Sequence, residues 1–240
     1  LSGLGRVGFF VDGERAELCP YAVYITAVVT VTYDLGSSGR RRRDFDILPP
    51  GDIRNCMVAL SEDEALLSRL FQYRFHSGRG LKGHSFGNLF LTALHQITGD
   101  FSHAVRLSSE ILAIRGKIFP ATAANVSREA RRLDGTVVAG ESRISKSRLP
   151  IDRIRTTPTR CAPLPVLIED HHQADIITLG PGSLYTSVIT NLLVEGIAEA
   201  LENSRALKVY FVNLMWQPGE TINFSASRHV EAVLKHARKH

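Results

Sequence analysis

Apolar and β-branched residues fall into short runs along the chain, and the spacing within each run indicates its structure. Residues 23–32 are β-branched almost throughout, which is typical of a central strand buried on both faces. Residues 176–179 form an apolar run short enough for a buried strand, and residues 207–213 form another. The pattern therefore predicts a sheet with buried strands.

Elsewhere, apolar residues recur at the three- and four-residue spacing of helices. Asp52 and Asp100 are suited to cap two of these helices, and Gly99 is suited to end the helix before Asp100. In the second helix we expect Leu66, Leu67, Leu70 and Phe71 to lie in the core. One predicted helix begins at Asp52 and another begins near Asn88. The other predicted helices cover residues 62–75, 100–113, 163–172, 196–203 and 227–239. Strands and helices together indicate an α/β fold.

Residues 117–155 interrupt this pattern with a series of short β-type runs. The Asp134-Gly135 pair between two of them is a strong hairpin signal. The segment predicts a small β-rich insertion around 117–155 within an α/β body. Residues 1–21 show no clear period, and their four glycines and one proline argue against a regular helix.

A glycine-rich turn follows the strand predicted over residues 176–179. Gly180, Pro181 and Gly182 break the apolar run, and Ser183 is a good N-cap for the helix after it. Glycines let a ligand approach the backbone, and the start of a helix offers free N–H groups to an anion. Many strand-to-helix junctions need glycine for geometry alone, so the turn by itself fits both interpretations.

Polar loops follow three of the predicted strands, at residues 33–40, 180–187 and 213–221. In one parallel sheet such loops meet at the carboxyl edge, where open α/β folds bind ligands. Their convergence favours a binding role for the turn. His84, after a second glycine-rich loop, fits a structural role and a ligand contact equally well. His171 and His172 have no Cys or carboxylate at metal-ligand spacing, and we expect them at the surface.

Charge and cysteine content narrow the classes of function. The net charge is +5, and the basic excess is partly local, in residues 40–43, in the arginines at 128, 131 and 132, and in the C-terminal tail. It favours a phosphorylated small molecule, or solubility alone, over nucleic acid, because no nucleic-acid module or interleaved aromatic residues accompany it. The three cysteines are far apart and lack metal spacing, which predicts a reducing, cytoplasmic setting. No apolar run approaches the roughly 18 residues of a membrane span.

Several motifs stand in an order that resembles a known family. They occupy residues 25–31, 36–40, 48–56, 83–88, 179–187 and 217–221. Together they resemble the gluconeogenesis factor branch of the 2-phospho-L-lactate transferase (CofD-like) family, over about residues 23–240. The Leu-Pro-Pro-Gly-Asp-Ile-Arg-Asn and Gln-Pro-Gly-Glu-Thr runs favour this branch over the transferase itself.

The resemblance implies a single domain over residues 1–240, with a Rossmann-like three-layer α/β/α sheet that contains the β-rich segment. It implies a cytoplasmic regulatory protein that binds a nucleotide sugar such as UDP-N-acetylglucosamine and serves growth on gluconeogenic carbon and cell shape. Two alternatives stay open: a transferase that moves phospholactate from a guanosine diphosphate carrier onto a deazaflavin, and a degenerate copy that binds nothing. Neither a metal nor nucleic acid is expected as a partner, and a homo-oligomer stays open.

The resemblance and the strand-end loops together suggest the ligand-binding residues. Residues of the 34–40 loop would line one wall, with Arg40 neutralising phosphate, and His84 and Asn88 would line another. The backbone of residues 180–183 would donate N–H groups, and Asn213 would close the site. The full predicted set is Asp34, Gly36, Ser37, Ser38, Arg40, Asn55, His84, Asn88, Gly180, Pro181, Gly182, Ser183, Tyr185, Thr186 and Asn213. No catalytic residue and no metal ligand is predicted.

The sequence departs from the family pattern in two places. The family opens with a strand and a Gly-Gly-Gly-Thr-Gly loop before Leu-Ser, so Leu1 and Ser2 are expected to stand where that loop has just ended. The family loop Asp-Asp-Gly-Gly-Ser-Ser-Gly is replaced by Tyr33-Asp34-Leu35-Gly36-Ser37-Ser38-Gly39, with one carboxylate and one glycine fewer. We therefore expect an N-terminally truncated site that keeps the 180–183 wall and lacks the opposite glycine loop.

Overall fold

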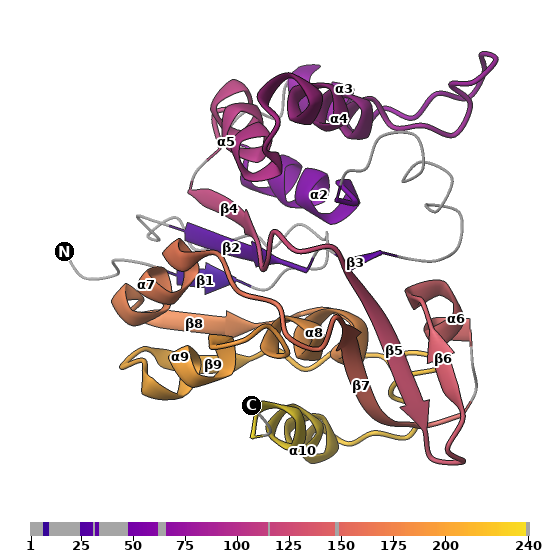
Figure 1. The fold of residues 1–240 in the computed structure, drawn as a ribbon, viewed down its shortest axis with the longest axis vertical. Coiled ribbons are helices and arrows are strands. Elements are labelled where there is room, and N and C mark those ends of the chain that lie inside the picture. The colour runs from indigo at the N-terminus through magenta and orange to yellow at the C-terminus, as the bar shows by residue number, and fades with distance from the viewer. Residues whose placement is uncertain are drawn as a thin grey trace.

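A parallel five-stranded sheet forms the centre of the protein (Figure 1). The computed structural model describes residues 7–9, 25–30, 32–33, 48–61, 66–114, 116–146 and 149–238. The strand order is β4-β2-β1-β8-β9, and every neighbouring pair is parallel. The strands are β1 (Val7–Phe9), β2 (Ile25–Val29), β4 (Lys117–Pro120), β8 (Ile176–Leu179) and β9 (Leu207–Tyr210).

Helices cover both faces of this sheet, because alternate residues of a strand point to opposite sides. Ala27 and Val29 of β2 pack with the first helical layer, whereas Val28 packs with the second. The first layer is α2 (Gly51–Leu60), α3 (Leu66–Gln72), α4 (Phe86–Thr98) and α5 (Phe101–Ile111). The second is α7 (Pro165–Gln173), the π-helix η1 (Leu184–Ile189), α8 (Thr190–Leu192) and α9 (Ile197–Asn203). The predicted three-layer α/β/α fold is confirmed.

A smaller second sheet packs beside this body. It contains β3 (Thr32–Tyr33), β5 (Val126–Arg132), β6 (Val137–Ala139) and β7 (Ile151–Thr157). β5 pairs antiparallel with β6 and β7, and Asp134 and Gly135 lie in the turn from β5 to β6, as predicted. Apolar residues of this sheet, such as Ala130 and Ile154, belong to the same core cluster as η1 and α8. The helices α6 (Glu141–Lys146) and α10 (Ala226–Ala237) complete the described structure.

Three strand predictions need correction. The single strand expected over residues 23–32 is two strands, because β2 lies in the parallel sheet while β3 pairs with β5 in the other. Residues 7–9, which show no periodic signal, form β1 between β2 and β8. β4, at the start of the predicted β-rich range, pairs with β2 in the main sheet. Strand partners far apart in the sequence decide all three outcomes.

The helix ends predicted at Asp100 and Gly99 are confirmed. Asp100 caps α5 by accepting a hydrogen bond from the backbone N–H of His103, and Gly99 ends α4 in the left-handed conformation with φ +70°. Asp52, in contrast, lies inside the first turn of α2, and Pro50 occupies the N-cap position.

The burial of several predicted residues differs from the expectation. In α3 only Phe71 is in the core, where its ring packs against Phe86 and Phe90, whereas Leu66, Leu67 and Leu70 are exposed. Ser68 and Phe71 form the buried face of this short helix, so its other apolar side chains face outward. His171 is buried and His172 exposed, so the surface prediction is wrong for the first and right for the second. The Nδ1 of His171 bonds the Leu167 carbonyl, and burial lowers the pKa of this imidazole.

Two arginines of the basic 128–132 group also lie in the interior. The guanidinium of Arg132 donates to the carbonyl oxygens of Ile144 and Gly219, at 2.6 and 2.8 Å. Arg128 is buried as well and forms an ion pair with Glu141 at 2.7 Å. These charges therefore hold loops together inside the fold and do not enlarge a basic surface.

No single helix in the described ranges has the length and apolar composition needed to cross a bilayer. The segments Leu184–Leu192 and Ile197–Asn203 meet those criteria only when combined across a 76° bend.

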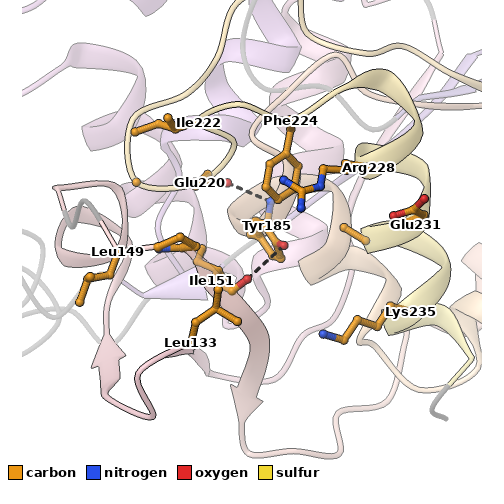
Figure 2. A pocket seen from close by; sticks show the side chains of 13 residues that line it. Leu133, Leu149, Ile151, Tyr185, Glu220, Ile222, Phe224, Arg228, Glu231 and Lys235 are labelled. Carbon is orange, nitrogen blue, oxygen red and sulfur yellow. Dashed lines mark hydrogen bonds between the residues drawn. The ribbon is translucent and has the colours of Figure 1, made fainter.

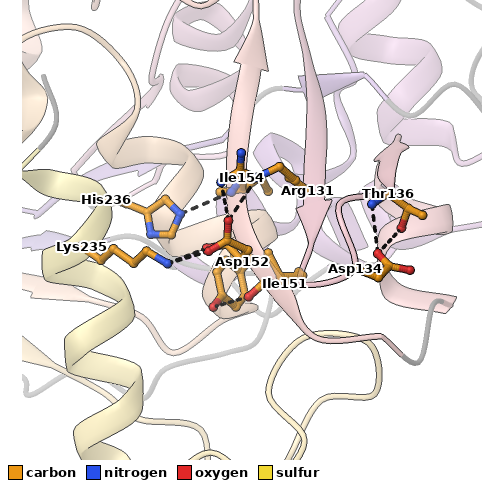
Figure 3. A network of polar contacts seen from close by, with 9 residues as sticks. Arg131, Asp134, Thr136, Ile151, Asp152, Ile154, Lys235 and His236 are labelled. Atoms are coloured by element: carbon orange, nitrogen blue, oxygen red, sulfur yellow. Dashed lines mark hydrogen bonds and ion pairs between the residues drawn. The ribbon is translucent and has the colours of Figure 1, made fainter.

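A polar network attaches α10 to β7 (Figure 3). Asp152 of β7 accepts from Lys235 of α10 at 2.9 Å and from Arg131 of β5 at 2.5 Å. The hydrogen bonds from Lys235 and then Arg131 lower the pKa of Asp152 to about 2. Beside them, the backbone N–H of Ile154 donates to Nε2 of His236, at 3.3 Å. Helix and sheet are thus joined by charge as well as by apolar packing.

The variant Asp152→Asn should reduce the free energy of unfolding by about 0.2–1 kcal/mol near neutral pH, the range of exposed ion pairs. The folded-state pKa is lowered, so the stabilisation is present above the ordinary value of 3.8 and declines as pH falls toward about 2. Urea unfolding across that acid range measures the decline. Glu231→Gln, on an exposed carboxylate of α10 outside this network, serves as the control. An Asp152→Asn difference that persists undiminished in acid contradicts the prediction.

Candidate functional site

The turn after β8 requires glycine at its first position. Gly180 has φ +79°, and a Cβ there would lie 2.8 Å from the carbonyl oxygen of Phe211. The Phe211 N–H in turn donates to the Leu179 carbonyl at 2.9 Å, which keeps the chain after β9 beside the turn. Gly180 therefore serves geometry at this junction, as one of the two interpretations of the sequence states.

The loop after β9 holds the turn through a reciprocal pair of hydrogen bonds. Asn213 accepts from the Gly182 N–H at 3.2 Å and donates to the Gly182 carbonyl at 2.7 Å. Gln217 Nε2 donates to Ser183 Oγ at 3.0 Å. Ser183 stands at the predicted N-cap position, but its side chain makes no capping hydrogen bond to the helix. Two of the three predicted strand-end loops, 180–187 and 213–221, thus meet at one place.

Glu220 performs the capping that Ser183 does not. Its carboxylate accepts from the backbone N–H groups of Tyr185 at 2.9 Å and Thr186 at 3.4 Å, and from the Thr186 hydroxyl at 2.8 Å. Glu220 is buried, and Figure 2 shows its bond to Tyr185. Burial raises the pKa of Glu220, while these hydrogen bonds and the charge of Arg128 oppose the rise. The N–H groups of Tyr185 and Thr186 in the first turn of η1 are consequently already engaged within the protein.

The end of β2 also reaches this place. The Thr30 hydroxyl donates to the Ser187 carbonyl at 3.1 Å. The first wall of the predicted site, with Asp34, Gly36, Ser37, Ser38 and Arg40, lies outside the described residues. Its contribution to the site stays a prediction.

The other predicted wall is organised by an arginine that the predicted set lacks. Arg54 of α2 donates to the side-chain oxygens of Asn55 and, at 3.2 Å, of Asn88, so it joins these two predicted residues. Gly87 packs against it, because a Cβ there would lie 2.9 Å from the Arg54 side chain. The Arg54 Nε is buried without a hydrogen-bond partner among the described residues. Burial lowers the pKa of Arg54, and the charge of Arg74 lowers it further.

The predicted residues of the 180–213 region differ in access. Pro181 is exposed, and Gly182, Ser183 and Asn213 are partly exposed. Tyr185 and Thr186 are buried, with 3% and 0% exposure, and the Thr186 side chain faces Glu220. His84 is partly exposed before α4. Ligand contact by each of these residues stays a prediction.

Glu220 and Arg54 are the residues that sequence reasoning missed. Both lie within motifs that carry the family resemblance, Gln-Pro-Gly-Glu-Thr and Gly-Asp-Ile-Arg-Asn. A carboxylate and an arginine inside such motifs were the available signal. In the described part of the chain, no three His, Cys, Asp or Glu side chains are grouped in a way that could hold a metal ion.

The parallel sheet, its two helical layers and the joined strand-end loops define a Rossmann-like α/β protein. The sequence profile of the family described as 2-phospho-L-lactate transferase CofD matches residues 10–240. The chain is 51% identical over 214 residues to the gluconeogenesis factor of Bacillus subtilis, covering 89% of this chain and 68% of that relative. It is 50% identical over 216 residues to the gluconeogenesis factor of Halalkalibacterium halodurans, covering 90% and 67%. The chain belongs to the CofD family, in its gluconeogenesis factor branch.

Solved structures agree with this assignment. The crystal structure of protein BH3568 from Bacillus halodurans matches with a TM-score of 0.92 at 47% identity, covering 97% of this chain and 76% of that one. A crystal structure of BH3568 described as a member of the UPF0052 family matches with a TM-score of 0.89 at 46% identity, with the same coverage.

A relative from Nostoc sp. is 52% identical over 213 residues, which are 89% of this chain. The chain spans about half of that relative, 47% of its length.

The variant Gly180→Ala should lower the free energy of unfolding by about 2–4 kcal/mol, because the left-handed backbone strain adds to the contact with the Phe211 carbonyl. Gly135→Ala is the matched control, because Gly135 has φ +86° but no heavy atom within 4 Å of the point that a Cβ would occupy. It should lose only the backbone term, about 1 kcal/mol. Urea unfolding measures both variants, and equal losses would contradict the packing argument.

The variant Glu220→Gln should be more stable relative to the wild type at neutral pH than in acid. A raised carboxyl pKa stabilises the fold below the ordinary value of 4.5, and this contribution is lost as pH rises through the folded-state value. The glutamine oxygen can still accept from the backbone N–H groups while remaining neutral. Urea unfolding at pH values below and above the titration of Glu220 tests this. Glu202→Gln, on an exposed residue of α9, is the control. A constant difference across pH would contradict it.

Proposed function

We propose that the chain binds a nucleotide sugar of the UDP-N-acetylglucosamine type at the carboxyl edge of its parallel sheet. The reciprocal hydrogen bonds between Asn213 and Gly182 carry this proposal, because they fix two strand-end loops at the edge where such folds bind ligands. Partly exposed Gly182, Ser183 and Asn213 lie together there.

In this proposal the phosphates meet the 180–183 turn and not the N–H groups of Tyr185 and Thr186, which Glu220 already engages. Arg40, Ser37 and Ser38 supply the opposite wall. Asn55 and Asn88, held by Arg54, offer amide groups to the sugar or the base.

The wider role follows the relatives. Proteins named gluconeogenesis factor are about half identical to this chain, for example in Bacillus subtilis. We propose that this chain likewise acts in the cytoplasm as a regulatory protein for growth on gluconeogenic carbon and for cell shape, with the nucleotide sugar as its signal.

The family profile favours a second candidate, a transferase. It describes a 2-phospho-L-lactate transferase and matches residues 10–240. Such an enzyme would move phospholactate from a guanosine diphosphate carrier onto a deazaflavin. Formation of that product by the purified chain would establish the transferase in place of the regulator.

Isothermal calorimetry with UDP-N-acetylglucosamine tests the leading proposal. The wild type should release heat with a saturable isotherm, and Asn213→Ala should weaken binding about three- to tenfold, the worth of one or two neutral hydrogen bonds. Asn203→Ala, at the exposed end of α9, is the matched control and should bind as the wild type does.

Circular dichroism of each variant separates loss of binding from loss of fold. A folded wild type that gives no heat at millimolar ligand refutes nucleotide-sugar binding and supports the degenerate copy. Equal affinities of Asn213→Ala and the wild type for the ligand would contradict a role of the loops after β8 and β9 in binding it.

A further inference from the structure

A cavity of about 300 Å³ lies between the second sheet, α10 and the loop that joins β9 to α10 (Figure 2). Its walls include Ile151 of β7, Tyr185 of η1 and Phe224 of the loop. The volume is at the lower end of the range for small-molecule sites. The turn at 180–183, where the phosphates are proposed to bind, does not line the cavity, although Tyr185 and Glu220 of the two strand-end loops do.

One side of the cavity is apolar. This side is formed by Leu149, Ile151, Ile222 and Phe224. The side chains of Leu149 and Ile222 are each 46% exposed. An apolar ligand that buries these exposed apolar side chains would be stabilised by the hydrophobic effect. The lining therefore suits a ligand with a compact, ring-sized apolar body.

The other side is cationic. Figure 2 shows Arg228 extending from α10 toward Phe224 and Tyr185, and Lys235 extending from the same helix toward β7. The Arg228 guanidinium carbon lies 5.7 Å from the centroid of the Phe224 ring. Arg228 takes part in none of the ion pairs formed within the described residues, although Glu231 lines the same cavity. Its charge is available to a ligand.

Lys235, the second cation of the cavity, shares its carboxylate partner with another cation. Asp152 is shared between Lys235 and Arg131, two cations on one carboxylate (Figure 3). Two acids line the cavity: Glu231 is exposed, whereas Glu220 is buried and holds the backbone of Tyr185 and Thr186. The cavity therefore combines apolar walls with two basic and two acidic residues, and of its two cations Arg228 has no ion pair among the described residues.

We propose that this cavity is a second ligand site, which binds a small amphipathic anion. An aromatic or branched apolar body lies between Ile151, Ile222 and Phe224, and a single carboxylate or phosphate group pairs with Arg228. A guanidinium beside an aromatic ring favours such a planar anion, because it can stack and form paired hydrogen bonds at once.

Fluorescence titration with 1-naphthaleneacetate tests the proposal, with neutral 1-naphthaleneacetamide as the matched probe. The acetate should bind about tenfold more tightly than the amide, since only the carboxylate can form an ion pair with the guanidinium. Arg228→Gln should abolish that preference and leave amide binding unchanged. Arg238→Gln, on an exposed arginine after α10 outside the cavity, should change neither affinity.

Ile222→Ser should weaken both probes alike, because it removes apolar wall and no charge; Ile222 is partly exposed, so the fold is retained. Equal affinities of the wild type for the two probes, an unchanged preference in Arg228→Gln, or no binding at millimolar probe would each overturn the proposal. Competitive displacement of the probe by UDP-N-acetylglucosamine would merge the cavity with the nucleotide site and overturn its independence. Probe binding by a chain that gives no heat with the nucleotide sugar would support the second site while refuting the proposed function.

Discussion

The buried carboxylate of Glu220 is the contact on which the arrangement of the candidate site depends. It brings the loop after β9 to the first turn of η1 and accepts hydrogen bonds from Tyr185 and Thr186 there. An unpaired N–H group in that position would cost about 1–3 kcal/mol, so the carboxylate stabilises the junction as well as placing it. Arg132 reaches the same loop from the second sheet through the Gly219 carbonyl. The main sheet, the second sheet and the site are therefore linked through residues 219–220.

Several elements of the fold could be predicted from local signals in the sequence. The caps at Asp100 and Gly99 and the Asp134-Gly135 hairpin depend on residues a few positions apart, and each was predicted correctly. β1 was missed because three residues without periodicity become a strand only through their neighbours β2 and β8.

Burial was harder to predict, since it depends on which surface a residue meets. Leu66 and Phe71 look alike in an apolar pattern, yet only Phe71 meets the aromatic rings of α4. For the candidate site, the order of the loops after β8 and β9 could be predicted, but the bonds between them could not. Gly182 and Asn213 are 31 positions apart, and nothing local indicates that one side chain holds the other residue's backbone.

The loops after β8 and β9 are hydrogen-bonded to each other at several points, so a change in one loop affects the contacts of the other. Asn213 bonds Gly182, Gln217 bonds Ser183, and Glu220 caps the helix after the turn. A chimera that takes residues 180–187 from one relative and residues 213–221 from another would separate side chains from the backbone groups that they hold. In exchanges between relatives, therefore, the two segments have to be transferred as a pair, although 25 residues of helix, strand and loop lie between them in the chain.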